Sequence, residues 1–130
     1  MNDLLQSLEI TASAMKAQST RLRYISENIA NADTPGFRRK LTTFQAVRDG
    51  IDPTGEIQSG PVRLDDRELP RVFDPSHPMA DDTGYYDGSN VEMLIEISDA
   101  RQAQRSYEAN VKMFDQARRM TSSLLDLLRR

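Results

Sequence analysis

The distribution of proline and glycine is the feature that most constrains how this chain can fold. All six prolines and all six glycines lie between Pro35 and Gly88, so residues 1–34 and 89–130 contain neither. Proline lacks the backbone donor that a helix needs, and glycine destabilises a helix interior. The distribution predicts two terminal helical regions, 1–32 and 89–130, that flank a middle segment at 33–88.

Residues 3–30 have the periodicity of an amphipathic helix. Seam residues recur at alternating intervals of four and three, which places them on one face. The seam consists of Leu4, Leu8, Thr11, Met15, Gln18, Leu22, Ile25 and Ile29. Its two polar members, Thr11 and Gln18, weaken an isolated helix pair but can fix its register.

The C-terminal region repeats this design over a wider face. Its seam consists of Met93, Glu96, Ala100, Ala103, Tyr107, Asn110, Phe114, Ala117, Thr121, Leu124 and Leu128. Further apolar residues flank that seam, so we expect contact with more than one neighbouring helix. Ser89 followed by Glu92 predicts a capping box at the start of this helix, with Asn90 as a second candidate N-cap.

The middle segment has the composition of turns and short strands. Asp33-Thr34-Pro35-Gly36-Phe37 predicts a type II turn that ends the first helix. Residues 41–47 and 61–72 predict short extended pieces, and the proline-rich residues 74–78 should also run extended. The predicted fold is mainly α, with the two terminal helices paired as in a coiled coil and a small irregular β-containing segment between them.

Composition excludes several classes of protein. Hydrophobic residues make up 38% of the chain, below the roughly 45–50% of ordinary domains, which predicts thin packing or stability borrowed from neighbouring subunits. The net charge of −3, without a dense basic stripe, argues against nucleic acid as a partner. The chain has no cysteine and no apolar run long enough to span a membrane. The first residues lack the pattern of a cleaved secretion signal.

Candidate catalytic and metal-binding residues are sparse. His77, with Asp74, Asp81 and Asp82 nearby, offers one soft ligand where a metal site needs three or four convergent ones. We therefore expect a surface histidine with a local hydrogen bond. Paired carboxylates such as Asp65-Asp66 more often solvate a loop than perform acid–base chemistry. No catalytic residue, cofactor or metal is predicted, and a small hydrolase would require a pocket that joins His77 to two carboxylates.

Arg38-Arg39-Lys40 is the strongest basic cluster in the sequence. Contact with an acidic patch on a neighbouring subunit and a solvated surface run are equally favoured interpretations. Weak attraction to phosphate or to acidic lipids is a third interpretation.

Three stretches of the chain resemble the flagellar basal-body rod, hook and hook-associated family. Residues 26–39, with Asn28-Ile29-Ala30-Asn31 followed by Thr34-Pro35-Gly36-Phe37, resemble its N-terminal signature. Residues 72–92 resemble the stretch before the last helix in proximal-rod members, and residues 105–111 resemble the C-terminal helix signature. The chain departs from the family pattern at Asp87-Gly88-Ser89, where a proline before the last helix is expected.

The resemblance implies a structural subunit of the proximal rod, the drive shaft that carries torque to the hook and filament. It implies export through the flagellar type III apparatus without a cleaved signal, and assembly in the periplasm. Implied partners are copies of the chain, other proximal-rod subunits, the rod-base adaptor, the membrane-ring protein and distal-rod subunits. The alternative is a free-standing cytosolic coiled-coil adaptor.

We predict three groups of functional residues for such an assembly. The helix-packing group consists of Leu8, Met15, Leu22, Ile25, Ile29, Tyr107, Phe114, Leu124 and Leu128. The family turn motif, which would set the exit from the helical core, consists of Asn28, Asn31, Thr34, Pro35, Gly36 and Phe37. Candidate inter-subunit contacts are Arg38, Arg39 and Asn110.

Overall fold

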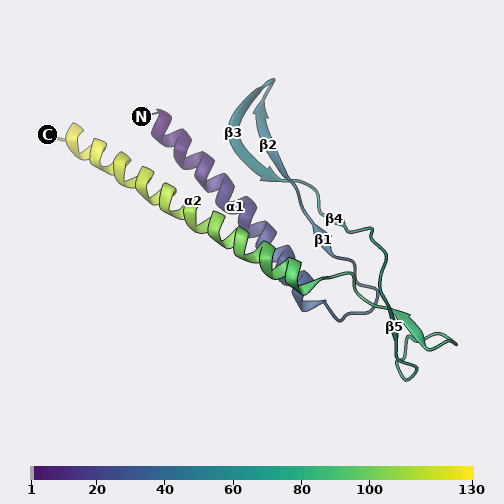
Figure 1. The fold of residues 1–130 in the computed structure, drawn as a ribbon. Helices are drawn as coiled ribbons and strands as arrows, with labels where there is room; N and C mark the ends of the chain where they lie inside the picture. The colour runs from purple at the N-terminus through teal and green to yellow at the C-terminus, as the bar shows by residue number, and fades with distance from the viewer. Residues whose placement is uncertain (1) are drawn as a thin grey trace.

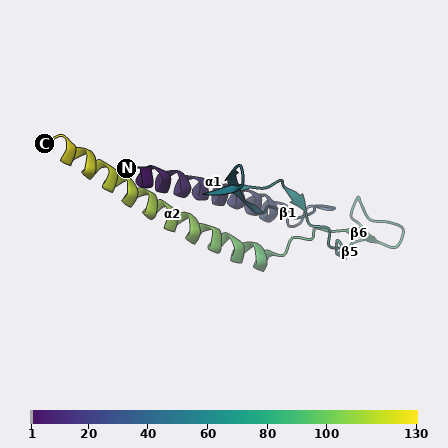
Figure 2. The same cartoon turned by 90° about the horizontal axis from the view of Figure 1, so that it is seen from above.

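Two long antiparallel helices dominate the computed structural model, which describes residues 2–130. Helix α1 spans Asn2–Ala30 and helix α2 spans Met93–Leu128, and the two lie side by side (Figures 1 and 2). The middle of the chain leaves the pair at the end of α1 and returns at the start of α2. The predicted fold, mainly helical with a β-containing segment between the helices, is confirmed.

The middle segment forms two-stranded antiparallel sheets. The strands are β1 (Lys40–Leu41), β2 (Phe44–Asp49), β3 (Asp52–Ser59), β4 (Arg63–Leu64), β5 (Arg71–Phe73) and β6 (Tyr85–Asp87). They pair as β1 with β4, β2 with β3 and β5 with β6. The β2–β3 hairpin lies along α1, whereas the β5–β6 hairpin projects beyond the helix pair (Figure 1).

Part of each predicted seam lies in the interface between the helices. In α1, Thr11, Gln18 and Ile25 are buried at intervals of seven residues. In α2, Glu96, Ala103 and Ala117 are buried on the same heptad spacing. Ala17 is also buried, so small side chains occupy much of the interface and allow the two backbones to approach closely. The polar Thr11 is satisfied within its own helix, since its hydroxyl lies 2.9 Å from the Ser7 carbonyl oxygen.

The remaining residues of the predicted packing group differ in exposure. Ile25 is buried, and Leu8, Met15, Leu22, Ile29 and Phe114 are half-buried. Tyr107 and Leu124 are each more than one-third exposed, and Leu128 is 75% exposed. Tyr107, Leu124 and Leu128 are covered by few other residues of this chain, and their role in assembly stays a prediction.

The predicted type II turn is present at residues 34–37. The Phe37 N–H donates to the Thr34 carbonyl at 3.2 Å, and Gly36 takes a positive φ of 73° at the position that requires it. Asn31 supports the turn, because its side-chain oxygen accepts the Thr34 hydroxyl at 3.0 Å. The family turn motif therefore ends α1 and directs the chain back along the helix pair.

The predicted capping box is wrong. Helix α2 begins at Met93, and Glu92 is the N-cap with an extended backbone. The Ser89 hydroxyl accepts the N–H of Val91 at 3.1 Å, one turn too early to cap the helix. The Asn90 side chain reaches across to other segments, because tertiary partners compete successfully with local capping.

The predicted extended course of residues 74–78 is also wrong. The His77 N–H donates to the Asp74 carbonyl, and the Ala80 N–H donates to the His77 carbonyl, each at 3.0 Å. The segment therefore makes two consecutive turns between β5 and β6. The Asp74 side chain stabilises the first turn by accepting the Ser76 hydroxyl at 2.6 Å.

The longest strand, β3, was not anticipated from the sequence. Its Gly55 has a φ of 86°, and a Cβ there would lie 2.8 Å from the Ile10 side chain. Close approach of the strand to α1 therefore requires glycine at this position. The Ile57 N–H also donates to the Ser13 hydroxyl at 3.2 Å, which ties the hairpin to the outer face of α1.

A buried polar junction joins the two helices to the middle segment. Arg39, with a side chain 12% exposed, forms an ion pair with Glu96, whose side chain is fully buried. The Arg39 guanidinium also lies 2.9 Å from an Asp99 carboxylate oxygen and 3.8 Å from one of Asp65. The segment after the turn, the 65–67 loop and the first turns of α2 thus meet at one guanidinium.

Two asparagines complete this junction. Asn28 accepts the Lys40 N–H at 2.8 Å and donates to the Lys40 carbonyl at 3.0 Å and to Glu96 at 3.4 Å. Asn90 accepts the Arg39 N–H at 2.7 Å and donates to the Asp65 carbonyl at 3.1 Å. Each side-chain amide therefore substitutes for a missing strand partner and links segments far apart in the sequence.

The three residues of the basic cluster Arg38-Arg39-Lys40 thus contact other residues of the same chain. Lys40 pairs with Glu27 at 2.7 Å, and Arg38 donates to the Arg67 carbonyl at 3.0 Å. For Arg39 the interpretation as a solvated surface charge is wrong, because acidic side chains of α2 and the 65–67 loop surround it. Contacts of Arg38 and Arg39 with a neighbouring subunit stay predictions.

Replacing Glu96 with alanine should destabilise the isolated chain by roughly 3 kcal/mol, because the buried Arg39 guanidinium loses its closest partner. Urea unfolding followed by far-UV circular dichroism measures the loss. Glu108→Ala, at an exposed position of the same helix, is the matched control and should unfold close to the wild type. Equal urea midpoints for both variants would contradict the burial of Arg39 against Glu96.

Candidate assembly surface

The chain buries little apolar surface on its own. Among residues 2–130 the buried apolar side chains are Ala17, Ile25, Ala103 and Ala117, three of them alanines. The accessible area is 9262 Å², whereas a compact monomer of this mass exposes about 6,900 Å². The excess, about 2,300 Å² on that scaling, is within the range that obligate protein interfaces bury.

Helix α2 carries most of the uncovered apolar side chains. Of nineteen large apolar side chains exposed in the described part of the chain, eleven lie on α2. They are Met93, Leu94, Ile97, Tyr107, Val111, Met113, Met120, Leu124, Leu125, Leu127 and Leu128. Exposure on this scale along one helix is typical of an interaction surface.

A continuous stripe runs along the C-terminal half of α2. Met113, Met120 and Leu127 repeat at intervals of seven and are 56%, 50% and 64% exposed. Met120 and Leu127 help to line a shallow groove of about 360 Å³, together with Gln116, Arg119, Ser123 and Leu124. We call the surface formed by Met113, Met120, Leu124 and Leu127 the α2 stripe.

The α2 stripe extends past the cover that α1 can provide. Arg21 contacts Asp99 at 3.7 Å and Asn28 contacts Glu96 at 3.4 Å, so the two helices run in opposite directions. Figures 1 and 2 show the C-terminal end of α2 reaching beyond the start of α1. The last turns of α2 therefore lack a helical neighbour within the described chain.

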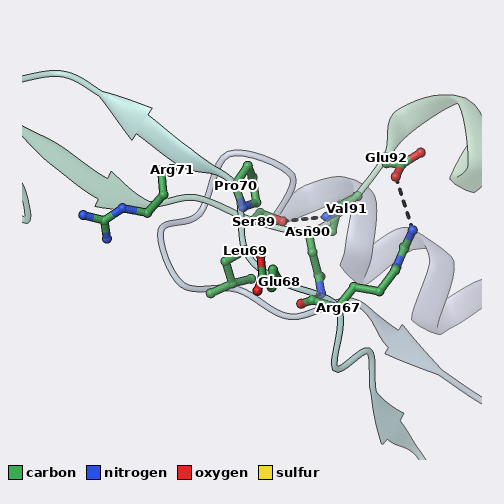
Figure 3. A pocket seen from close by; sticks show the side chains of 9 residues that line it. All are labelled: Arg67, Glu68, Leu69, Pro70, Arg71, Ser89, Asn90, Val91 and Glu92. Carbon is green, nitrogen blue, oxygen red and sulfur yellow. Dashed lines mark hydrogen bonds and ion pairs between the residues drawn. The ribbon is translucent and has the colours of Figure 1, made fainter.

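A larger pocket lies where the chain enters α2. Its volume is about 530 Å³, and residues 67–71 and 89–92 line it (Figure 3). Its charged groups are largely paired, since Arg67 contacts Asp65 at 2.8 Å and Glu92 at 3.3 Å. Arg71 points away from the pocket and pairs with Asp81 and Asp87 of the β5–β6 hairpin. Three of the four charged residues in its lining, Arg67, Arg71 and Glu92, are therefore held in ion pairs.

The single histidine makes local contacts, as predicted. The Nδ1 atom of His77 accepts the Met79 N–H at 3.1 Å, and its ring stacks on Tyr86 with centroids 4.0 Å apart. Within residues 2–130 no three His, Cys, Asp or Glu side chains converge in a way that could hold a metal ion. The same described residues include no helix that is both long and apolar enough to cross a membrane.

The carboxylates of the middle segment do more than solvate loops. Asp65 is 7% exposed, and its hydrogen bond with the Arg67 side chain holds its pKa below the ordinary value. Asp81 accepts the Thr83 hydroxyl at 2.6 Å and the Tyr85 N–H at 3.1 Å, which lowers its pKa strongly. Glu96 stands at a seam position of the sequence, and the partner of Asp65 is local, since the Arg67 N–H also donates to its carboxylate at 3.0 Å.

Asn110, a predicted inter-subunit contact, is half-buried in the seam of α2. Its side-chain amide donates to the Ser106 carbonyl of the same helix at 2.8 Å. The side-chain oxygen of Gln18, on the facing surface of α1, is buried without a partner in the described structure. The contact of Asn110 with another subunit stays a prediction.

Both ends of the chain match flagellar rod families. Residues 1–38 match the flagella basal body rod protein family, and residues 82–127 match the C-terminal family of the flagellar basal body rod proteins FlgEFG. The chain is 39% identical to the flagellar basal-body rod protein FlgC of Agrobacterium fabrum, over 99% of this chain and 98% of that protein. The FlgC proteins of Aquifex aeolicus and Bacillus subtilis are 37% and 30% identical, over 88% and 93% of this chain and 89% and 95% of theirs.

The carboxyl group of Asp81 should titrate below the roughly 3.9 of an unperturbed aspartate, because four hydrogen-bond donors favour its charged form. Its folded pKa is lowered, so its stabilisation of the hairpin is complete above the unfolded pKa and is lost as pH falls through the folded one. Carbon-13 NMR of the carboxyl measures the midpoint, and Asp81→Asn assigns the resonance. A midpoint at or above the ordinary value would contradict the bonding described.

Proposed function

This chain belongs to the FlgC family of flagellar basal-body rod proteins, and from that premise we propose that it builds the proximal rod by helix–helix packing. It is a structural subunit of the flagellar basal body, not an enzyme, and it assembles with other rod components. Its position in the proximal part of the rod and its particular contacts with neighbouring subunits are what we propose.

One observation supports helix packing as the mode of assembly. The helix pair leaves a wide apolar face of α2 exposed, while its own interface consists mainly of alanine and polar side chains. A face of this width needs a second helical neighbour to be covered. We propose that α1 and α2 of adjacent subunits provide this cover, so that the terminal helices form an inner layer.

The middle segment has a complementary role in this proposal. Its hairpins lie outside the helix pair, and the polar junction at Arg39 fixes them to it. A buried, fully bonded junction resists displacement of the hairpins relative to the helices. Torque carried by the helical layer would therefore reach the hairpins and, through them, neighbouring subunits without a flexible link.

We further propose the partners and the route of the subunit. The partners are copies of this chain, other proximal-rod subunits, the rod-base adaptor, the membrane-ring protein and distal-rod subunits. The subunit would pass unfolded through the flagellar type III apparatus, without a cleaved signal, and complete its fold in the periplasm. The thin core supports this route, because a chain with few buried apolar side chains unfolds at low cost.

A free-standing coiled-coil adaptor is the less favoured function. It would need a self-contained helix pair, whereas every side chain from 122 to 130, at the end of α2, is exposed. The family matches at both ends of the chain favour the rod subunit as well.

Amide hydrogen exchange should differ between the free chain and assembled basal bodies. In the free chain, residues 113–128 should exchange rapidly because few tertiary contacts cover them. In basal bodies the same amides should become protected. Residues 93–103, which adjoin the polar junction, serve as an internal reference and should show partial protection in both. Strong protection of residues 113–128 in the free chain would favour the adaptor.

Phe114→Asp should abolish incorporation into basal bodies and swimming motility, because it places an unpaired charge in the seam of α2. Complementation of a strain that lacks the gene, scored in soft agar and by immunoblots of purified basal bodies, measures both. His77→Ala is the control and should leave both nearly unchanged, since its contacts are local. Normal incorporation with lost motility in His77→Ala would contradict a purely structural role.

A further inference from the structure

The two ends of this elongated subunit carry complementary surfaces. The β5–β6 hairpin lies at one end of the molecule and the C-terminal end of α2 at the other (Figures 1 and 2). Both ends expose apolar side chains, and the two ends differ in the sign of their charge. We propose that the β5–β6 hairpin of one copy docks on the α2 stripe of a second copy.

The hairpin presents an apolar cluster within an acidic surround. Phe73, Met79 and Tyr85 are 61%, 65% and 40% exposed, and the rings of Phe73 and Tyr85 lie 5.0 Å apart. Residues 70–88 contain four aspartates and one arginine, a net charge of −3. The exposed rings and methionine are the kind of side chain that anchors an interface.

The hairpin holds this cluster in a defined shape. Gly84 has a φ of 87°, and a Cβ there would lie 2.8 Å from the Phe73 ring. Arg71 pairs with Asp81 at 2.6 Å and with Asp87 at 2.9 Å, which braces the two strands. A preformed hairpin loses little conformational entropy when it docks.

The α2 stripe has the opposite charge. Residues 112–130 contain five basic and two acidic side chains, a net charge of +3. Arg119 lines the groove of about 360 Å³ beside Met120, Leu124 and Leu127. Glu9, an acidic residue near the start of α1, lines a separate groove with Asp49 and Asp52 of the β2–β3 hairpin. Arg119 and Arg118 share Asp115 of the same helix as a partner, at 2.9 and 3.2 Å, and the end of α2 keeps its net positive charge despite these two pairs.

The geometry of this contact has a consequence for assembly. The two surfaces are different patches at opposite ends of the same subunit, so the interface is heterologous and does not close on itself as a twofold dimer would. Repetition of such a contact propagates along an axis. This inference rests on the proposed function, because it presupposes that copies meet along the rod.

Paired cysteine substitutions test the contact directly, since the natural chain has no cysteine. Cells would co-express one chain with Met79→Cys and another with Met120→Cys, and purified basal bodies would be treated with a short bis-maleimide. We expect a crosslinked product of two copies when both variants are present. Ile51→Cys, 88% exposed on the β2–β3 turn, replaces Met79→Cys in the matched control and should give none.

The outcomes separate this inference from the proposed function. Incorporation of both variants without a crosslink would overturn the docking and leave the rod role intact. A crosslink between this chain and a different rod subunit would overturn the assignment of a second copy as occupant. Absence of the wild-type chain from basal bodies would instead overturn the proposed function.

A charge exchange provides a second test if a cysteine variant fails to incorporate. Asp82→Arg and Arg119→Glu should each lower incorporation by about two- to fivefold, the range expected when an exposed ion pair is lost. The double variant should recover most of that loss, because the two charges are then exchanged. Additive losses in the double variant would overturn the docking.

Discussion

The ion pair between Arg39 and Glu96 is the interaction on which the arrangement of this molecule depends. Glu96 is fully buried in the first turns of α2, and Arg39 follows the turn that ends α1. Asn28 and Asn90 bind the backbone on either side of this pair, so that both helices and the 65–67 loop are fixed together. Burial of an ion pair contributes little net stability, but its geometric demands select one arrangement over others. A thin apolar core such as this one cannot impose that selection alone.

The small amount of apolar surface that the chain buries explains why it is suited to assembly. The helix interface uses alanines and polar residues at heptad positions, which allows close contact but removes little apolar area from water. Large side chains are concentrated on the outer faces of α2 instead. In the proposed assembly, contacts between subunits would supply the hydrophobic contribution that a globular domain gains internally, and the polar junction would maintain the shape of each subunit until those contacts form.

Periodic features were predictable from the sequence, and features that depend on distant partners were not. The heptad of Thr11, Gln18 and Ile25 lies in the helix interface because its spacing alone places it on one face. The turn at residues 34–37 follows from Pro35 and Gly36. In contrast, Asn90 has the signature of a helix cap but bonds to Arg39, because a tertiary partner satisfies it better. Residues 74–78 were expected to be extended, yet the side chain of Asp74 folds them into a turn.

The sequence by itself determined two amphipathic helices and the turn that separates them from the middle segment. These properties are local, since they depend on spacing, on proline and glycine, and on residue type. Only the tertiary structure decided that Arg39 is buried against Glu96 and that the β2–β3 hairpin lies along α1. Those properties depend on which segments meet in space, and a single sequence does not encode the identity of a charge's partner in any local pattern.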